Sequence, residues 1–386
     1  MPTLPTDSTQ RIQVLDILRG VALLGMFVVH FHVHSTDPGG IDEILRTFIW
    51  RLVETKSHGT FALLFGAGFA IQLRRAEAQG RPLARRYLRR LAVLAAFGFA
   101  AHAFFGYNVL LGYAVWGVPL LLIRSWSTRT LLLIAVLSAA SVGLYHLAAS
   151  RFLIATAGPA GEAATYQAAR AEASRVNEAL EAAEAQDSYS VVLAARLRHM
   201  AWFYRQPFFF MPGATMTLFI VGLLLIRHRV FEQARAHTRL LVGMMIFGVV
   251  SWIADNWLLP GSVGLLRDQW LTFTYVGGAL LFLSYKPDLI VWLRPVASAG
   301  RMALTNYLLQ IATLDLIFAG YGIGLGKVRP VIAFPMALAC FVIEVVFSTI
   351  WLRHFQFGPA EWLWRSLTYG RPQPMALTRL GAPAQG

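Results

Sequence analysis

The sequence predicts an all-α integral membrane protein with about ten transmembrane helices in a single polytopic domain, residues 1–386. Hydrophobic residues make up 56% of the chain, charged residues make up only 14%, and the mean hydropathy is +0.54. A soluble domain of this length is rarely so apolar. The apolar residues gather in segments of membrane-spanning length, and arginines gather between these segments. Composition and patterning therefore predict the same class.

The first apolar segment contains Asp16 and Arg19 and is followed by no small-residue cleavage site, so it predicts a retained helix and not a secretory signal. The others are bounded by short polar connections. The predicted spans are about 14–34, 59–73, 88–105, 107–123, 130–148, 208–226, 239–258, 264–284, 302–319 and 331–352.

Alternate connections between the spans are strongly basic. The connection from Arg74 to Arg90 is the richest, and with ten spans all of the basic connections fall on one side. This pattern predicts that both termini are cytoplasmic. The net charge of +14 is then a topological signal and does not indicate nucleic-acid binding. The single cysteine, Cys340, excludes a disulfide framework and a thiolate metal site.

Residues 149–207 form the longest polar connection, which we predict to be an extracytoplasmic helical insertion. The stretch from Gly161 to Gln186 is rich in Ala and Glu, which favour helix. The following stretch, from Val191 to Tyr204, alternates apolar residues with arginines and predicts an interfacial amphipathic helix. The insertion is expected to be a surface spacer, with a lid as the alternative. The alternating residues are Leu193, Leu197, Met200 and Tyr204 against Arg196, Arg198 and Arg205.

The first span carries a polar stripe. In a helix, Arg19 lies about 60° and His30 about 40° from Asp16 around the axis, and His34 returns to the same side. Ionisable groups within a membrane are functional candidates by default. The alternative is that Asp16 and Arg19 only lock helix packing. His32 points away from His30 and His34, so the His-x-His-x-His run does not predict a metal site.

Further polar residues lie at the predicted outer ends of other spans and imply a water-filled cavity. Lys56, His102 and Asn108 are the main ones. The sequence has no Gly-x-Ser-x-Gly elbow, Walker loop or Cys-x-x-Cys pair. What remains is a histidine general base, either His30 or His102, with Lys56, Asn108 or Asp255 as orienting groups or stabilisers of negative charge.

Five blocks of sequence resemble the YeiB-like bacterial inner-membrane proteins (domain of unknown function 418). The resemblance covers nearly the whole chain. The opening block also resembles the acyltransferase 3 family and the heparan-α-glucosaminide N-acetyltransferases, which indicates a transmembrane acyltransferase superfamily. The blocks are Leu15–Gly20, Lys56–Phe69, Arg89–Tyr113, Gly300–Tyr307 and Gly358–Arg365.

This resemblance implies that an acyl group passes from cytoplasmic acyl-CoA to an extracytoplasmic or membrane-accessible hydroxyl or amine. The expected acyl group is acetyl, with acetyl-CoA as the donor. In the acyltransferase 3 pattern the base is a histidine 14 residues after the Asp, which is His30 here. Guanidinium groups suit the CoA phosphates. The residues assigned to acyl-CoA binding are Asp16, Arg19, Arg85, Arg86, Arg89, Arg90, Arg301 and Asn306, and those assigned to catalysis are His30, His102, Lys56 and Asn108.

The expected location is the bacterial inner membrane. The expected partners are the lipid bilayer, acyl-CoA and a small-molecule, lipid or glycan acceptor, and a homodimer is a further option. Neither nucleic acid nor a metal ion is expected to bind. The main alternative is a small-molecule or lipid transporter that uses the same polar stripe as a proton-coupled path. A structural or sensory subunit is a third interpretation.

Overall fold

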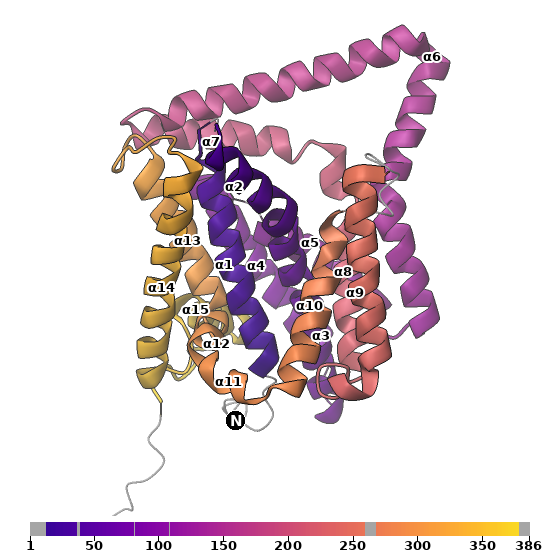
Figure 1. Ribbon diagram of the computed structural model, residues 1–386, viewed down its shortest axis with the longest axis vertical. Coiled ribbons are helices and arrows are strands. Elements are labelled where there is room, and N and C mark those ends of the chain that lie inside the picture. The colour runs from indigo at the N-terminus through magenta and orange to yellow at the C-terminus, as the bar shows by residue number, and fades with distance from the viewer. Residues whose placement is uncertain (1–12, 37–38, 81, 108, 259–267, 378–386) are drawn as a thin grey trace, which may run out of the picture.

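The computed structural model describes residues 13–36, 39–80, 82–107, 109–258 and 268–377. Within these ranges every regular element is a helix, as the sequence predicts (Figure 1). Five short helical turns connect the longer elements: Trp50–Glu54, Pro207–Phe210, Ala234–His237, Ala254–Leu258 and Asp268–Trp270. The α-helices are α1 (Gln13–Val33), α2 (Ile41–Ile49), α3 (Thr55–Ala78), α4 (Ala84–Phe105), α5 (Val109–Ile123), α6 (Thr128–Glu184), α7 (Tyr189–Phe203), α8 (Gly213–Arg227), α9 (Thr238–Ile253), α10 (Leu271–Tyr285), α11 (Asp288–Trp292), α12 (Arg294–Arg301), α13 (Ala303–Phe318), α14 (Pro330–His354) and α15 (Pro359–Tyr369).

Among the described residues, five helical segments are long and apolar enough to cross a membrane. They are α1, α4, α6, the segment Ala234–Leu258 that contains α9, and α14. Helices α5, α8, α10 and α13 are apolar but shorter. Each of the ten predicted spans contains a helix, whereas the shorter helices α2, α11, α12 and α15 lie outside these spans and were not predicted. The count of ten crossings stays a prediction.

The outer surface of the bundle is apolar. On the first half of α6, Leu132, Leu133, Val136 and Leu137 are 48%, 58%, 55% and 54% exposed, respectively. A contiguous exposed surface of this kind marks a protein or membrane contact. Side chains of this type belong in the hydrocarbon core of a bilayer. The exposed apolar surface therefore agrees with the composition.

Helix α1 lies inside the bundle, between α14 and α3 (Figure 1). It packs on α12 through two glycines. A Cβ atom at Gly20 would lie 2.2 Å from the carbonyl oxygen of Val296, and one at Gly300 would lie 1.9 Å from that of Asp16. Small residues allow helix backbones in membranes to approach closely. The first and fourth family-like blocks of the sequence thus meet, and the charges on α1 face protein instead of lipid.

We expect Gly300→Ala to lower the melting temperature of the detergent-solubilised protein. The added methyl group has no room, and overpacking typically costs about 1–3 kcal/mol. Gly243→Ala on α9 is the matched control, because a Cβ at Gly243 would meet no atom within 4 Å. Equal melting temperatures for the two variants would contradict the close α1–α12 contact.

The basic connections lie together at one end of the bundle. Arg74 at the end of α3 pairs with Glu232 after α8 at 2.9 Å, and Arg227 at the end of α8 donates to the carbonyl oxygen of Trp126 after α5 at 2.9 Å. The start of α1, the end of α14, α11 and α12 share this end, and α7 lies at the other (Figure 1). This arrangement is what the charge pattern predicts for one side of a membrane.

The predicted insertion is helical and arches over the opposite end of the bundle (Figure 1). Helix α6 leaves the bundle, breaks at Gly158 (φ 71°, ψ 173°) before Pro159, and returns above the other helices. Glycine tolerates the positive φ angle, and proline cannot donate a helical hydrogen bond, so this pair sets the bend. Helix α7 then packs across α4.

The amphipathic pattern predicted for α7 is corrected in one respect. Leu197 is 41% exposed, whereas Arg196, expected on the polar face, is only 2% exposed. The Arg196 guanidinium donates to Glu184 of α6 at 3.0 Å and to Asp315 of α13 at 2.5 Å. Burial alone would lower the pKa of Arg196, but the hydrogen bonds and charges of Asp315 and Glu184 raise it above its ordinary value. The arginine is buried because two carboxylates compensate its charge.

Candidate functional site

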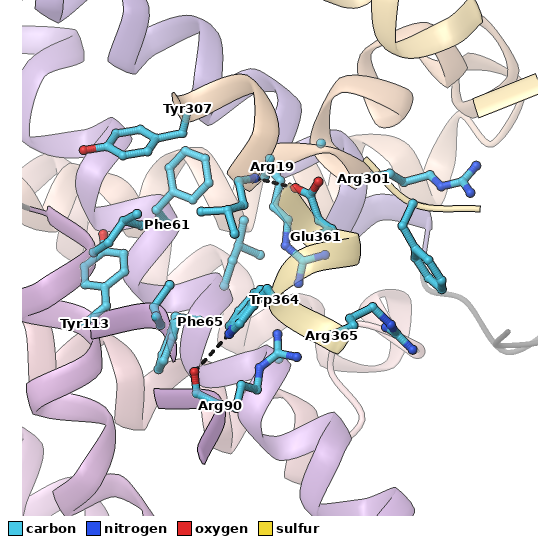
Figure 2. Close-up of a pocket in the computed structure, with 18 of the residues that line it drawn as sticks. Arg19, Phe61, Phe65, Arg90, Tyr113, Arg301, Tyr307, Glu361, Trp364 and Arg365 are labelled. Carbon is cyan, nitrogen blue, oxygen red and sulfur yellow. Dashed lines mark hydrogen bonds between the residues drawn. The ribbon is translucent and has the colours of Figure 1, made fainter. Parts of the chain in front are cut away.

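A cavity of about 390 Å³ lies inside the bundle and extends from its basic end toward the middle of α1 (Figure 2). Helices α1, α3, α4, α5, α13 and α15 all contribute to its walls. This volume is in the range of small-molecule sites. The residues that line the cavity include Arg19, Met26, Phe61, Phe65, Tyr87, Arg90, Tyr113, Arg301, Leu304, Tyr307, Phe357, Glu361, Trp364 and Arg365.

Four arginines line the cavity at its basic end. The Arg19 guanidinium lies 3.0 Å from the buried carboxylate of Asp16. Arg90 stacks on the indole of Trp364 at 3.6 Å, and the Trp364 Nε1–H donates to the carbonyl oxygen of Arg90 at 2.9 Å (Figure 2). The other two are Arg301 and Arg365, and the latter lies 4.3 Å above the ring of Phe357.

Glu361 is the one carboxylate among the described lining residues, and its oxygens are occupied. They accept hydrogen bonds from the backbone N–H of Leu304 (2.6 Å), the backbone N–H of Thr305 (3.1 Å) and the Thr305 hydroxyl (2.5 Å). In return, the Thr305 hydroxyl accepts the N–H of Ala360 at 3.0 Å. Glu361 of α15 thus caps the N-terminus of α13, and Thr305 of α13 caps that of α15, since the first N–H groups of a helix lack internal partners. The cavity mouth keeps a positive character suited to an anionic ligand.

Aromatic rings form the deeper walls. Phe65 contacts Tyr113, with 5.7 Å between ring centroids, and the Tyr113 hydroxyl donates to the carbonyl oxygen of His58 at 2.8 Å. Tyr307 lies at the end away from the arginines (Figure 2). The cavity therefore joins a cationic mouth to an apolar interior.

His30 lies next to the deep end of the cavity. It does not line the cavity, but Met26 does, one helical turn before it on α1. The His30 ring lies 6.4 Å from that of Tyr307, 4.5 Å from that of Tyr107 and 6.5 Å from that of His58. His30 is 5% exposed, and no described residue hydrogen-bonds its Nδ1. The polar stripe thus leads from the arginine mouth to a buried imidazole.

His102 belongs to a different group of rings. Its Nδ1 is 2.8 Å from the Tyr204 hydroxyl, and the ring of His199 lies 5.9 Å away, so it contacts the insertion and not the cavity. Its Nε2 has no hydrogen-bond partner among the described residues. The two histidines proposed as bases are therefore not brought together, and it is His30 that adjoins the cavity.

Of the other predicted catalytic residues, Lys56 does not line the cavity. Lys56 is 1% exposed, and its carbonyl oxygen accepts the hydroxyls of Thr60 (2.8 Å) and Thr272 (3.3 Å) between α3 and α10. Asn108 lies outside the described residues. Among those described, no group of three His, Cys, Asp or Glu side chains could hold a metal ion.

The residues predicted to bind the acyl donor separate into two sets. Arg19, Arg90 and Arg301 line the cavity, and Asp16 pairs with Arg19. The other four lie elsewhere. Arg85, Arg86 and Arg89 are exposed, with Arg86 over the Tyr369 ring at 5.5 Å. Asn306 is fully buried and donates to the carbonyl oxygen of Ala299 (3.1 Å) and the Ser348 hydroxyl (2.9 Å), so it holds α12, α13 and α14 together.

The sequence interpretation gave no role to Tyr307, Glu361, Trp364 or Arg365. All four lie in the two C-terminal blocks that carry the family resemblance. A detectable signal was the Trp-Leu-Trp-Arg run, Trp362–Arg365, because guanidinium groups pair favourably with indole rings, and ligand pockets combine aromatic walls with a few charged groups.

The fold and the cavity define a polytopic helical membrane protein with a cation-lined internal site. Residues 11–161 match the family model described as "Heparan-alpha-glucosaminide N-acetyltransferase, catalytic", and residues 225–371 match "Protein of unknown function (DUF418)". The chain belongs to the YeiB-like DUF418 family. Both matched segments contribute walls to the one cavity: Arg19 and Arg90 come from the first, and Arg301 and Arg365 from the second.

Similar proteins match along nearly their whole length. The uncharacterized protein YxaH of Bacillus subtilis (strain 168) is 30% identical over 96% of this chain and 98% of its own. An uncharacterized 39.9 kDa protein in the amylase 3' region of Bacillus acidopullulyticus is 28% identical, covering 97% and 99%. The uncharacterized protein YeiB of Escherichia coli (strain K12) is 27% identical, covering 93% and 96%. No solved structure matches the chain.

Proposed function

We propose that this protein is a membrane acyltransferase that moves an acetyl group from cytoplasmic acetyl-CoA to a hydroxyl or amine acceptor on the other side of the bilayer. The observation that carries the proposal is the cavity that joins four arginines to an aromatic interior beside His30. The match of residues 11–161 to an acetyltransferase catalytic family supports the same chemistry. In this arrangement the basic end of the bundle faces the bacterial cytoplasm.

The donor fits the cavity by charge and polarity. The CoA phosphates would bind Arg19, Arg90, Arg301 and Arg365, because guanidinium groups form strong charge-assisted hydrogen bonds to phosphate oxygens. The less polar pantetheine arm would lie between Phe61, Phe65 and Leu304. Arg19 and His30 are separated by about 16 Å along the helix axis, which is a distance that an extended arm can bridge.

His30 would act as the general base. Its buried, neutral imidazole would take the proton of the acceptor as the acceptor attacks the thioester. His102 is the alternative base, because the Nε2 of its ring is also without a described partner. We use glucosamine as the probe acceptor, because a glucosaminide is named in the matching family, and water as the background acceptor.

Binding of acetyl-CoA to the purified protein is the direct test. We expect binding in nanodiscs, measured by isothermal titration calorimetry, to be stronger for acetyl-CoA than for ADP. Arg365→Gln should weaken it about tenfold, since one charge-assisted hydrogen bond contributes about 1.5 kcal/mol or more. Arg129→Gln removes the same charge at the same end of the bundle, outside the cavity, and should leave the affinity unchanged.

The rival functions predict other results. A transporter or a structural subunit would show no preference for the thioester over ADP, and that outcome would contradict the proposal. Equal losses of affinity in Arg365→Gln and Arg129→Gln would show that binding depends only on the overall charge of the basic end of the bundle. That result would contradict a phosphate site inside the cavity.

A further inference from the structure

Three tyrosines line the cavity, and their hydroxyls differ in what they contact. The Tyr113 hydroxyl donates to the carbonyl oxygen of His58 at 2.8 Å. The Tyr87 hydroxyl is buried without a hydrogen-bond partner among the described residues and is directed toward α5, where a Cβ at Gly117 would lie 3.2 Å from it. The Tyr307 hydroxyl also donates no hydrogen bond within the described part of the chain, but it lies at the end of the cavity away from the arginines, beside His30. Of these two hydroxyls, that of Tyr307 is therefore the one placed to bind a ligand next to the proposed base.

The position of Tyr307 is fixed from two directions. It lies one turn into α13, whose first N–H groups are held by Glu361, so the helix start cannot shift freely. Its ring is 4% exposed and packs in the core that contains Phe27, Ile311 and Leu314. Figure 2 shows its hydroxyl at the end of the cavity, pointing away from the arginines. A donor held this firmly is preorganised for a developing charge.

Tyr307 also lies beside His30, with 6.4 Å between ring centroids. A ligand whose phosphates bind at the arginine mouth would bring its far end between these two rings. For acetyl-CoA that far end is the thioester. One of the two groups can remove a proton, and the other can donate a hydrogen bond.

We propose that the Tyr307 hydroxyl donates a hydrogen bond to the thioester carbonyl oxygen and stabilises the oxyanion formed there during acyl transfer. This inference rests on the proposed function and adds a second catalytic residue to it. Tyr307 is buried, and such a hydrogen bond is strongest away from bulk water.

The reaction balances with these two residues. The acceptor oxygen or nitrogen bonds to the thioester carbon while its proton passes to His30, and the carbonyl electron pair moves to the oxygen that Tyr307 holds. When that pair returns, the carbon–sulfur bond breaks, and the sulfur takes the proton from His30. The products are the acetylated acceptor and CoA thiol, and both side chains regain their starting states.

Tyr307→Phe tests the role because it removes only the hydroxyl. We expect the rate of thiol release from acetyl-CoA, with glucosamine or water as acceptor, to fall about 100-fold, as for loss of one oxyanion donor. The dissociation constant for acetyl-CoA should change less than twofold. Tyr275→Phe is the control: its hydroxyl donates to the carbonyl oxygen of Leu52 far from the cavity, and its loss should not alter the rate.

The outcomes separate the inference from the function it rests on. An unchanged rate in Tyr307→Phe beside an active wild type overturns the role of Tyr307 and leaves the acyltransferase proposal intact. Equal losses of rate and affinity also overturn it, since they indicate a binding contact alone. A wild type without thioester turnover overturns both. If Tyr307→Phe has a lower melting temperature than the wild type, 3-fluorotyrosine at position 307 is the second variant, because it keeps the shape of the side chain and makes the hydroxyl more acidic. An unaltered rate in that variant overturns the role of Tyr307.

Discussion

His30→Gln is expected to reduce acetyl transfer by about 10³-fold while acetyl-CoA still binds. General-base catalysis by a positioned side chain contributes roughly 10²–10⁴-fold, and glutamine cannot accept the proton. Binding should persist because Arg19 lies about 16 Å from His30 along the axis of α1, and the other three arginines also line the end of the cavity away from Tyr307 and His30. Thiol release and calorimetry on the same preparation measure the two effects separately.

Two further variants make this result specific. His146→Gln removes an exposed imidazole of α6 and should leave transfer unchanged. His102→Gln tests the alternative base. Full activity in His30→Gln together with lost activity in His102→Gln would identify His102, which contacts α7, as the general base. Full activity in both single variants and in the double variant would refute a histidine base altogether.

Arg196→Met is expected to cost about 3–5 kcal/mol of stability and to release α7 from the bundle. Breaking a buried ion pair by removing one partner leaves uncompensated charge, and here two carboxylates, Glu184 and Asp315, lose their cation. The carbonyl oxygen of Phe104 loses its contact at 2.5 Å as well. Melting temperature measures the first effect, and limited proteolysis between α6 and α8 measures the second.

Arg198→Met is the matched control, because Arg198 is exposed two residues further along α7. Surface charges contribute at most about 1 kcal/mol, so its melting temperature should stay close to that of the wild type. Equal cleavage of both variants would contradict the anchoring role of Arg196 and return the insertion to a loosely attached spacer.

Most of the helical fold could be predicted because its signals are local. Apolar runs locate the helices, and arginines in the connections order them. The Gly158–Pro159 break also carries a local signal, since a glycine followed by a proline disfavours a continuous helix. Whether the shorter apolar helices α5, α8, α10 and α13 cross the membrane depends on the helices that pack around them, which a segment-by-segment pattern does not include.

The candidate site could be predicted only in part. Arg19 and His30 share one helix, so the helical period alone places them on one side. Arg301 and Arg365 reach the same cavity because Gly300 packs on α1 and Trp364 on Arg90, contacts between residues far apart in the chain. Asn306 is polar enough to bind a ligand, but its amide N–H groups donate to the carbonyl oxygen of Ala299 and the hydroxyl of Ser348.

The sequence by itself determined the membrane class, the positions of the helices, the basic end and the stripe from Asp16 to His30. Each of these follows from composition or from spacing within one segment. The tertiary structure decided that Arg90, Arg301 and Arg365 join Arg19 around one cavity, that His30 and not His102 adjoins it, and that Arg196 is buried. These features depend on which helices pack together. Hydropathy is similar for many possible helix pairs and cannot select among them, so the choice is made by how side chains from distant segments fit together.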